Sequence, residues 1–372
     1  MNARNKASYV SSHILSPAVA SKIARKITPK KWRLPMTQTF NRRQFLRSTG
    51  LLGMGLAAGQ LAAPHVAKAS TAQIRVVSNP GLENATLNTL MEQQGYLRQF
   101  GANALMVDIP GNTGPFDAIG AGAADVCMVS GYNMVLPRIA QGAKVKVVGA
   151  GMRKCALTVF ARPERISKLA DLKGKTVAVG PATGLLNMLM MQLLREADID
   201  VSQLNFINKG SNDACHEAVA KGEADACCSS VSHLNDHDGL VAINGGNLWE
   251  ALPRCIFQTA YASNSALRDK HDGLVAVMAA YGALYEYLMS PAAHDAFFEA
   301  RKRAQKDFDH ASALAIWDFN QSQRPYSRDL SLTGGDMAYL QDMDIAFGTL
   351  KQKLPIEAVA DMSAARAAAK LQ

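Results

Sequence analysis

The chain has no acidic residue in its first 69 positions, although 12 Lys or Arg residues occur there. The whole chain carries a formal charge of +9, from 40 basic and 31 acidic residues. Taking the 12 leader cations from the 40 leaves 28 against 31, a net charge near −3. The excess of positive charge lies in the N-terminal segment, so no nucleic-acid or anionic-membrane partner is expected for the rest of the chain.

Enzyme signatures are also missing. No G-x-S-x-G occurs, His216-Glu217-Ala218-Val219-Ala220 lacks the second His of a zincin, and residues 120–125 end in Asp where a dinucleotide fingerprint needs Gly. Beyond the leader, no segment reaches about 18 uninterrupted apolar residues, the length of a membrane-spanning helix. We therefore expect no catalytic residue, no cofactor and no later transmembrane helix.

The leader has the pattern of an export signal. Residues 41–47, with Arg42 and Arg43, resemble the twin-arginine signal, and a mildly apolar stretch and the small-x-small site at residues 67–69 follow. The pattern predicts export through the Tat translocon, cleavage near Ala69 and a soluble periplasmic protein. An uncleaved N-terminal anchor is the alternative, and either Met1 or Met36 fits as the start.

A motif occurs twice at an offset of 100 residues. Residues 112–130 and 212–230 align without a gap, and seven of nineteen positions are identical, among them Gly122/Gly222 and Asp125/Asp225. Each copy has the pattern of a polar loop, a helix capped by its Asn, a Gly stop and a buried strand. The duplication predicts two similar α/β lobes whose strand ends and helix N-termini face one another.

Residues 170–184 (ADLKGKTVAVGPATG) resemble the nitrate/sulfonate/taurine family of ABC-transporter solute-binding proteins, which also contains thiamine-pyrimidine binders. The resemblance continues through the Asn212 helix and residues 222–226 and covers most of residues 74–350. It implies the two-lobe α/β periplasmic-binding-protein fold (type II), with two hinge crossings and a helical C-terminal tail on the first lobe.

Four regions follow from this organisation. Residues 1–69 form the leader, 70–155 the first lobe, 156–256 the second lobe, and 257–372 a return strand and the helical tail. The hinge candidates are residues 153–157 and 258–261. Six cysteines follow the leader, and an oxidising compartment permits pairing without requiring it.

The candidate ligand site consists of polar loops at the ends of the predicted strands. The loop at residues 181–184 follows a buried strand and precedes a helix, so its free N–H groups and the Thr183 hydroxyl offer a cradle for an anion or polar group. Tyr132 is interpreted either as a stacking residue or as a packing residue. The full candidate set is Asn79, Asn112, Thr113, Ser130, Gly131, Tyr132, Pro181, Ala182, Thr183, Gly184, Ser211, Asn212, Ser229 and Ser230.

No metal site is expected, because the segment from Cys227 to His237 has no standard ligand spacing. Zn or Cu ligation by Cys228, His233 and His237 stays open as an alternative. Cys227 is expected in a strand core, as the counterpart of Cys127, and Cys228 near the cleft.

The sequence thus predicts a monomeric extracytoplasmic solute-binding protein that delivers a small anionic or polar molecule to an inner-membrane ABC permease. Sulfonate, nitrate, carboxylate and pyrimidine ligands all fit. The alternatives are a biosynthetic enzyme or metal-binding redox protein on the same fold, or a ligand-sensing receptor component.

Export can be tested directly. If Arg42 and Arg43 are the recognised pair, replacing both by Lys is expected to leave the precursor in the cytoplasm with its leader attached. Cell fractionation and the mass of the product measure this. Normal processing of the double variant would contradict the Tat assignment.

Overall fold

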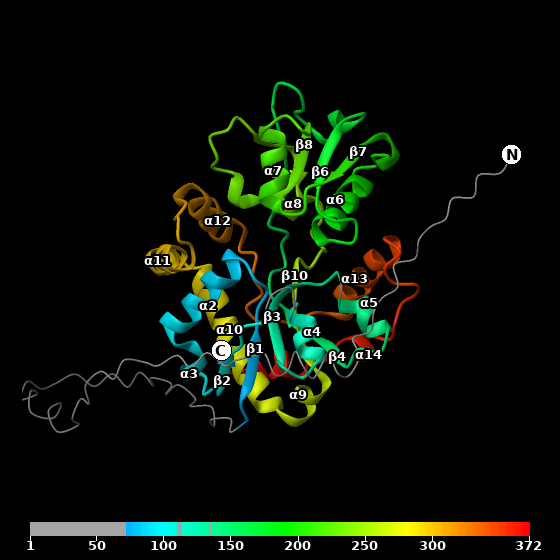
Figure 1. Ribbon diagram of the computed structural model, residues 1–372. Coiled ribbons are helices and arrows are strands. Elements are labelled where there is room, and N and C mark those ends of the chain that lie inside the picture. The colour runs from blue at the N-terminus through cyan, green and yellow to red at the C-terminus, as the bar shows by residue number, and fades with distance from the viewer. Residues whose placement is uncertain (1–71, 110–113, 134) are drawn as a thin grey trace, which may run out of the picture.

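A computed structural model describes residues 72–109, 114–133 and 135–372. The leader, including Arg42, Arg43 and Ala69, lies outside the described residues, as do Asn112 and Thr113. The described chain forms two α/β lobes, one above the other in Figure 1, each built on a five-stranded sheet. The predicted fold class is confirmed.

The first sheet has the strand order β2-β1-β3-β10-β4, in which β1, β2 and β3 are parallel and β10 is antiparallel to both neighbours. Its strands are β1 (Ile74–Val77), β2 (Ala104–Met106), β3 (Val126–Gly131), β4 (Val145–Ala150) and β10 (Gln258–Ser263). Its helices are α2 (Leu82–Gln94), α3 (Tyr96–Gln99), α4 (Pro115–Gly120), α5 (Val135–Ala140) and α9 (Asn264–Asp269).

The second sheet has the order β7-β6-β8-β5-β9, with β6, β7 and β8 parallel and β5 antiparallel to β8 and β9. Its strands are β5 (Leu157–Ala161), β6 (Thr176–Val179), β7 (Asn205–Asn208), β8 (Ala226–Ser230) and β9 (Val241–Asn247). Its helices are α6 (Leu185–Glu196), α7 (Asn212–Ala220) and α8 (Leu248–Ala251), with short 3-10 helices η1 (Leu169–Leu172), η2 (Val201–Gln203) and η3 (Val231–His233).

The chain passes between the lobes twice, from β4 to β5 and from α8 to β10. The two passages lie side by side, because Gly151 N donates to Gln258 O at 2.9 Å and Gln258 N donates to Met152 O at 2.9 Å. The first passage overlaps the predicted hinge at residues 153–157. The second hinge, predicted at residues 258–261, is wrong, since these residues belong to β10 and pair with strands on both edges.

The duplicated motif performs the same structural task in both lobes. Asp125 N donates to Arg75 O and Asp225 N to Thr176 O, both at 2.8 Å. The Asp125 carboxylate accepts the Arg75 N–H at 2.8 Å, and that of Asp225 accepts the Thr176 N–H at 2.9 Å. Each aspartate therefore joins the start of its strand to the neighbouring strand.

Only in the first lobe do ion pairs strengthen this contact. Asp125 is almost fully buried, and its carboxylate is held by the Arg75 guanidinium at 2.8 Å and by Lys270 Nζ at 2.9 Å. Burial alone would raise the pKa of Asp125, but the hydrogen bonds from Arg75 and Lys270 outweigh it and lower the pKa. The first lobe thus carries a buried ion-pair network where the second has a neutral backbone partner.

The helix starts differ from the sequence prediction, which made Asn112 and Asn212 the caps, by two residues in α4 and by one in α7. Ser211, not Asn212, is the N-cap of α7, because its hydroxyl accepts the Ala214 N–H at 3.2 Å. The N-cap of α4 is Gly114, with Pro115 as the first helical residue. Proline suits that position because its missing N–H would have no partner there.

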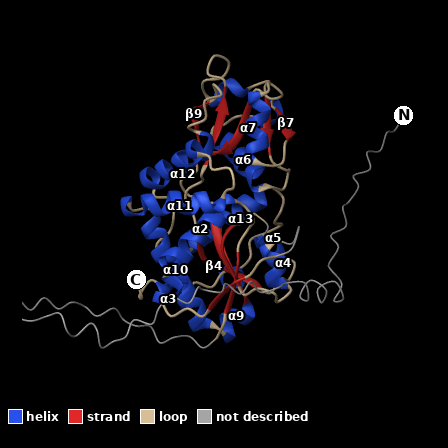
Figure 2. Cartoon of the chain, turned by 60° about the vertical axis from the view of Figure 1, so that its left-hand side comes forward, coloured by secondary structure: helices blue, strands red, loops and turns tan. Residues whose placement is uncertain are grey.

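The chain after β10 is helical, as expected, but the sequence pattern indicated helices only at residues 267–289, 294–306 and 335–351, so the longest helix that it missed is the one at residues 310–323. Its elements are α10 (His271–Leu288), η4 (Pro291–Ala293), α11 (His294–Ala304), α12 (His310–Gln323), α13 (Gly334–Ala346), α14 (Ile356–Val359) and α15 (Ser363–Ala368). The missed helix, α12, lies level with the junction of the lobes in both views (Figures 1 and 2). It packs on η3, and Phe319 of α12 meets Trp249 of α8 at 5.2 Å between ring centroids, so the tail contacts both lobes.

Among the described residues, no single helix is long and apolar enough to cross a membrane. Helix α10 and residues 291–304 together reach the length and apolar composition of a membrane span, but they form a bent pair.

The repeated glycines give a matched stability test. Gly122 and Gly222 have φ of +72° and +75° with open space where a Cβ would lie, so either change to Ala is expected to cost about 1 to 2 kcal/mol, from backbone strain alone. Gly120→Ala is the control, since Gly120 is the last residue of α4 and has equal space for a Cβ, and the change is expected to be neutral or stabilising by about 0.5 to 1 kcal/mol. Thermal unfolding measures all three. Equal effects at 120 and 122 would contradict the assigned turn.

Candidate functional site

We call the loops that follow the strands of each lobe its rim. The rims of the two lobes meet at the loops that follow β3 and β6. Asn133 Nδ2 donates to Thr183 O at 2.9 Å. A Cβ on Gly131 would lie 3.0 Å from Leu185 Cδ2, so only glycine allows this approach without displacing that side chain. The structure therefore brings the Gly131 turn and the loop at residues 181–184 together, two segments 50 residues apart in sequence.

The loop at residues 181–184 is exposed and leads directly into α6. Gly184 is the N-cap of α6, and no side chain caps the helix. The first turn of a helix has N–H groups without intrahelical partners, and the helix dipole makes this end electropositive. One carbonyl of the loop already has a hydrogen-bond partner, since Ala182 O accepts a hydrogen bond from Asn187 Nδ2 at 2.9 Å. The loop thus offers donors to a bound molecule.

Asn79 and Ser130 lie together on the first rim. Asn79 Nδ2 donates to Ser130 Oγ at 2.9 Å, and the buried Tyr261 hydroxyl donates to the same oxygen at 3.3 Å. Tyr261 comes from β10, the return strand, which the sequence reading had not included in the site. This network fixes the position of Asn79 at the end of β1.

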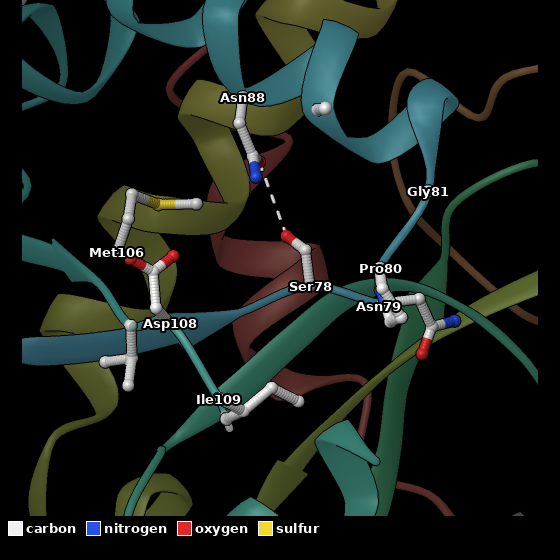
Figure 3. A pocket seen from close by; sticks show the side chains of 10 residues that line it. Ser78, Asn79, Pro80, Gly81, Asn88, Met106, Asp108 and Ile109 are labelled. Atoms are coloured by element: carbon white, nitrogen blue, oxygen red, sulfur yellow. Dashed lines mark hydrogen bonds between the residues drawn. The ribbon is translucent and has the colours of Figure 1, made fainter. Parts of the chain in front are cut away.

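A cavity of about 400 Å³ opens beside this network, between the ends of β1 and β2 and the start of α2. Ser78, Asn88 and Asp108 give it a polar lining, and Ser78 Oγ lies 3.3 Å from Asn88 Oδ1. Figure 3 shows these three side chains on one side of β1, while Asn79 points the other way. The sequence reading missed all three residues.

Asp108 is the charged group of this cavity. It is exposed, and it makes no hydrogen bond or ion pair with any other described residue. The sequence pattern indicates a strand over residues 104–109, which would include Asp108, but β2 ends at Met106. Lys209, the one obvious cation that the sequence places in the rim loops, forms an ion pair with Glu223 at 2.5 Å. The described rim is therefore not positively charged.

The structure corrects the interpretation of Tyr132 as a stacking residue. Its side chain is fully buried, and its hydroxyl lies 3.3 Å from Met343 Sδ in α13. Burial raises the pKa of the Tyr132 phenol well above its usual value. Tyr132 is a core residue, the other interpretation left open by the sequence.

The predicted serines of the second lobe are occupied by internal hydrogen bonds. Ser211 caps α7, Ser229 is buried and donates to Asn212 O at 2.8 Å, and Ser230 accepts the Ser232 N–H at 3.1 Å. They shape the loops that follow the strands rather than reach across to the first lobe. Among the predicted residues of this lobe, the structure brings only the loop at 181–184 against the opposite rim.

All six cysteines are free and buried. Cys227 lies in a small core cluster with Phe160 and Cys215, as its counterpart Cys127 suggested. Cys228 is also fully buried, so the expectation that it lies near the cleft is wrong. Burial raises the pKa of both thiols, which keeps them protonated and unreactive.

The fold is that of the periplasmic binding proteins. The alkanesulfonate-binding protein SsuA of Xanthomonas axonopodis pv. citri, solved with MOPS, is similar with a TM-score of 0.62 at 19% identity, over 78% of this chain and 99% of its own. The periplasmic aliphatic sulphonate binding protein SsuA of Escherichia coli is similar with a TM-score of 0.64 at 15% identity, over 77% of this chain and 91% of its own. The desulfurization enzyme DSZB is similar with a TM-score of 0.57 at 13% identity, over 79% of this chain and 98% of its own.

The family model described as NMT1/THI5 like matches residues 84–293, more than half of the chain. The chain therefore belongs to the NMT1/THI5-like family. No curated protein sequence matches it. The structural likenesses show the fold alone, because binding proteins and an enzyme share it at these identities.

Proposed function

We propose that this chain is an extracytoplasmic solute-binding protein that holds a small polar organic molecule between its lobes and delivers it to an inner-membrane ABC permease. The observation that carries the proposal is the contact between the rims, where Asn133 of the first lobe reaches Thr183 of the second at 2.9 Å. In open α/β sheets, ligands bind at the carboxyl ends of the strands, which is where both loops lie. The leader pattern supports export through Tat and release near Ala69, and the proposed mature form is a monomer.

The polar groups around the rims favour a binding site over a catalytic one. The second lobe offers the loop at residues 181–184 and the start of α6, and the first offers Asn79 and Ser130. These are neutral hydrogen-bonding groups that orient a ligand. The thiols of Cys127 and Cys227, the matching strand residues of the duplicated motif, are buried and protonated, as is that of Cys228, and so do not supply a nucleophile.

The charge of the first rim narrows the class of ligand. Asp108 places an unpaired carboxylate in the cavity beside β1, and the Lys209 cation is held by Glu223. A like charge facing an anionic ligand is unfavourable, while a donor or cationic group gains a charge-assisted hydrogen bond. The proposed ligand therefore presents an amino or ring N–H group to Asp108 and an acceptor or anionic group to α6. Aminopyrimidines and aminosulfonates have this character, whereas nitrate and simple alkanesulfonates do not.

A thermal-shift screen of aminopyrimidines, aminosulfonates, alkanesulfonates, carboxylates and nitrate tests this proposal. A ligand at about 100 times its Kd is expected to stabilise the protein by about 2.7 kcal/mol, which raises Tm by a few degrees. Asp108→Asn is expected to weaken an amino-bearing ligand by about 10-fold, equivalent to about 1.4 kcal/mol, since a charge-assisted hydrogen bond becomes neutral.

The matched control is Asp272→Asn, whose side chain is 95% exposed at the start of α10. This helix start lies at the opposite end of β1, because Gly273 packs against Ile74. Affinity of the control is expected to equal that of the parent. Tight binding of a plain anion that Asp108→Asn leaves unchanged would overturn the ligand class, and the absence of a shift with all five classes would overturn the solute-binding role.

A further inference from the structure

Two imidazoles and two carboxylates converge in the second lobe, outside the site described above. His216 comes from α7, His233 ends η3, and Asp236 and Asp238 follow in the loop that leads to β9. The loop folds back over α7, so residues far apart in sequence become neighbours. We call these four residues the His–Asp cluster.

The donor atoms of His216, His233 and Asp236 lie within 4.8 Å of one another, close enough to be ligands of one ion. His233 Nδ1 lies 2.8 Å from Asp236 Oδ2. His216 Nδ1 lies 3.9 Å from the same oxygen and 3.5 Å from Asp238 Oδ2. A tetrahedral Zn²⁺ ion with bonds of about 2.0 to 2.1 Å separates neighbouring ligand atoms by about 3.3 Å, within the range of these distances.

His216 is held in one orientation by its surroundings. It is 4% exposed and packs edge-on against Phe160 at 4.9 Å between ring centroids. Its Nδ1 faces the two carboxylates, while its Nε2 is buried without a hydrogen-bond partner among the described residues. The nitrogen that faces the carboxylates is therefore the one that would bind an ion.

His233 has the carboxylate support that metal-binding histidines show. Its Nε2 lies 3.2 Å from Asp213 Oδ1, while its Nδ1 faces Asp236. A carboxylate behind the second ring nitrogen orients the imidazole and increases its basicity.

One rearrangement is required. The two rings are stacked, with centroids 4.1 Å apart and planes 9° from parallel. The lone pairs of imidazole lie in the ring plane, so both rings cannot point at one ion until one of them tilts. His233 is the ring that can move, since it is part-exposed in a three-residue 3-10 helix, whereas His216 is buried in α7.

We propose that His216, His233 and Asp236 bind one divalent transition-metal ion of the Zn²⁺ type, which joins the loop after β8 to α7, with Asp238 beside His216 and outside the ligand set. Imidazole and carboxylate ligands together suit such borderline ions. The set differs from the Cys228, His233 and His237 alternative, because Cys228 is buried in the core and His237 is exposed. The site also adjoins α12, which packs on η3, so a bound ion would stiffen the contact between the tail and the second lobe.

The test uses the full mature chain without a His tag, stripped with a chelator and titrated with Zn²⁺ by calorimetry and elemental analysis. One equivalent is expected to bind. His233→Gln and Asp236→Asn are expected to weaken binding by more than the roughly 10-fold to 100-fold that outer-sphere changes cost. Both residues are part-exposed, so these variants keep the buried His216 in place. Loading with Co²⁺ is expected to give the strong visible bands of tetrahedral coordination in the parent and not in the variants.

His237→Ala is the matched control, an exposed histidine on the same loop whose loss is expected to leave Zn²⁺ binding unchanged. No binding to the parent, or binding that survives both His233→Gln and Asp236→Asn, would overturn the proposal and leave a His–Asp hydrogen-bond network. Equal loss in His237→Ala would move the site to the exposed loop and also overturn it. The proposal is independent of the solute-binding role, since Asp108→Asn is expected to leave Zn²⁺ binding unchanged.

Discussion

The hydrogen bonds between the two passages that connect the lobes determine the rest of the architecture. Gly151 and Met152 pair with Gln258, so the chain leaves and re-enters the first lobe along one line. Two adjacent passages allow the lobes to bend toward each other and resist twisting. The carboxyl ends of β3 and β6 consequently face one another, and Asn133 reaches Thr183. Helix α12 sets a second constraint beside the hinge, because it belongs to the tail and packs on η3 of the second lobe.

The sequence predicted the parts of the fold that local chemistry dictates. The duplicated motif was visible because Gly122 and Gly222 need a left-handed conformation and because Asp125 and Asp225 each bond the neighbouring strand. The loop before α6 was equally clear from its position between a buried strand and a helix. Helix α12 was missed because it is buried between other elements, with Ala313, Ile316 and Phe319 inside, and shows little one-sided pattern.

The site was predicted less well, for reasons that depend on tertiary contacts. Tyr132 follows β3 in sequence, but its ring turns into the core against α13. Asp108 enters the cavity because β2 stops two residues before it, and strand ends are the least reliable feature of a sequence reading. His216 and His233 are brought together by the fold of a loop, which no linear spacing reveals.

Closure of the lobes around a ligand is the central claim, and small-angle scattering tests it most directly. The mature chain is measured alone and with a saturating ligand identified by its thermal shift. The account predicts a smaller radius of gyration with the ligand, because the paired passages permit a hinge motion that brings the rims together. An unchanged radius at confirmed saturation would contradict it, since the molecule would then bind without any movement of one lobe toward the other.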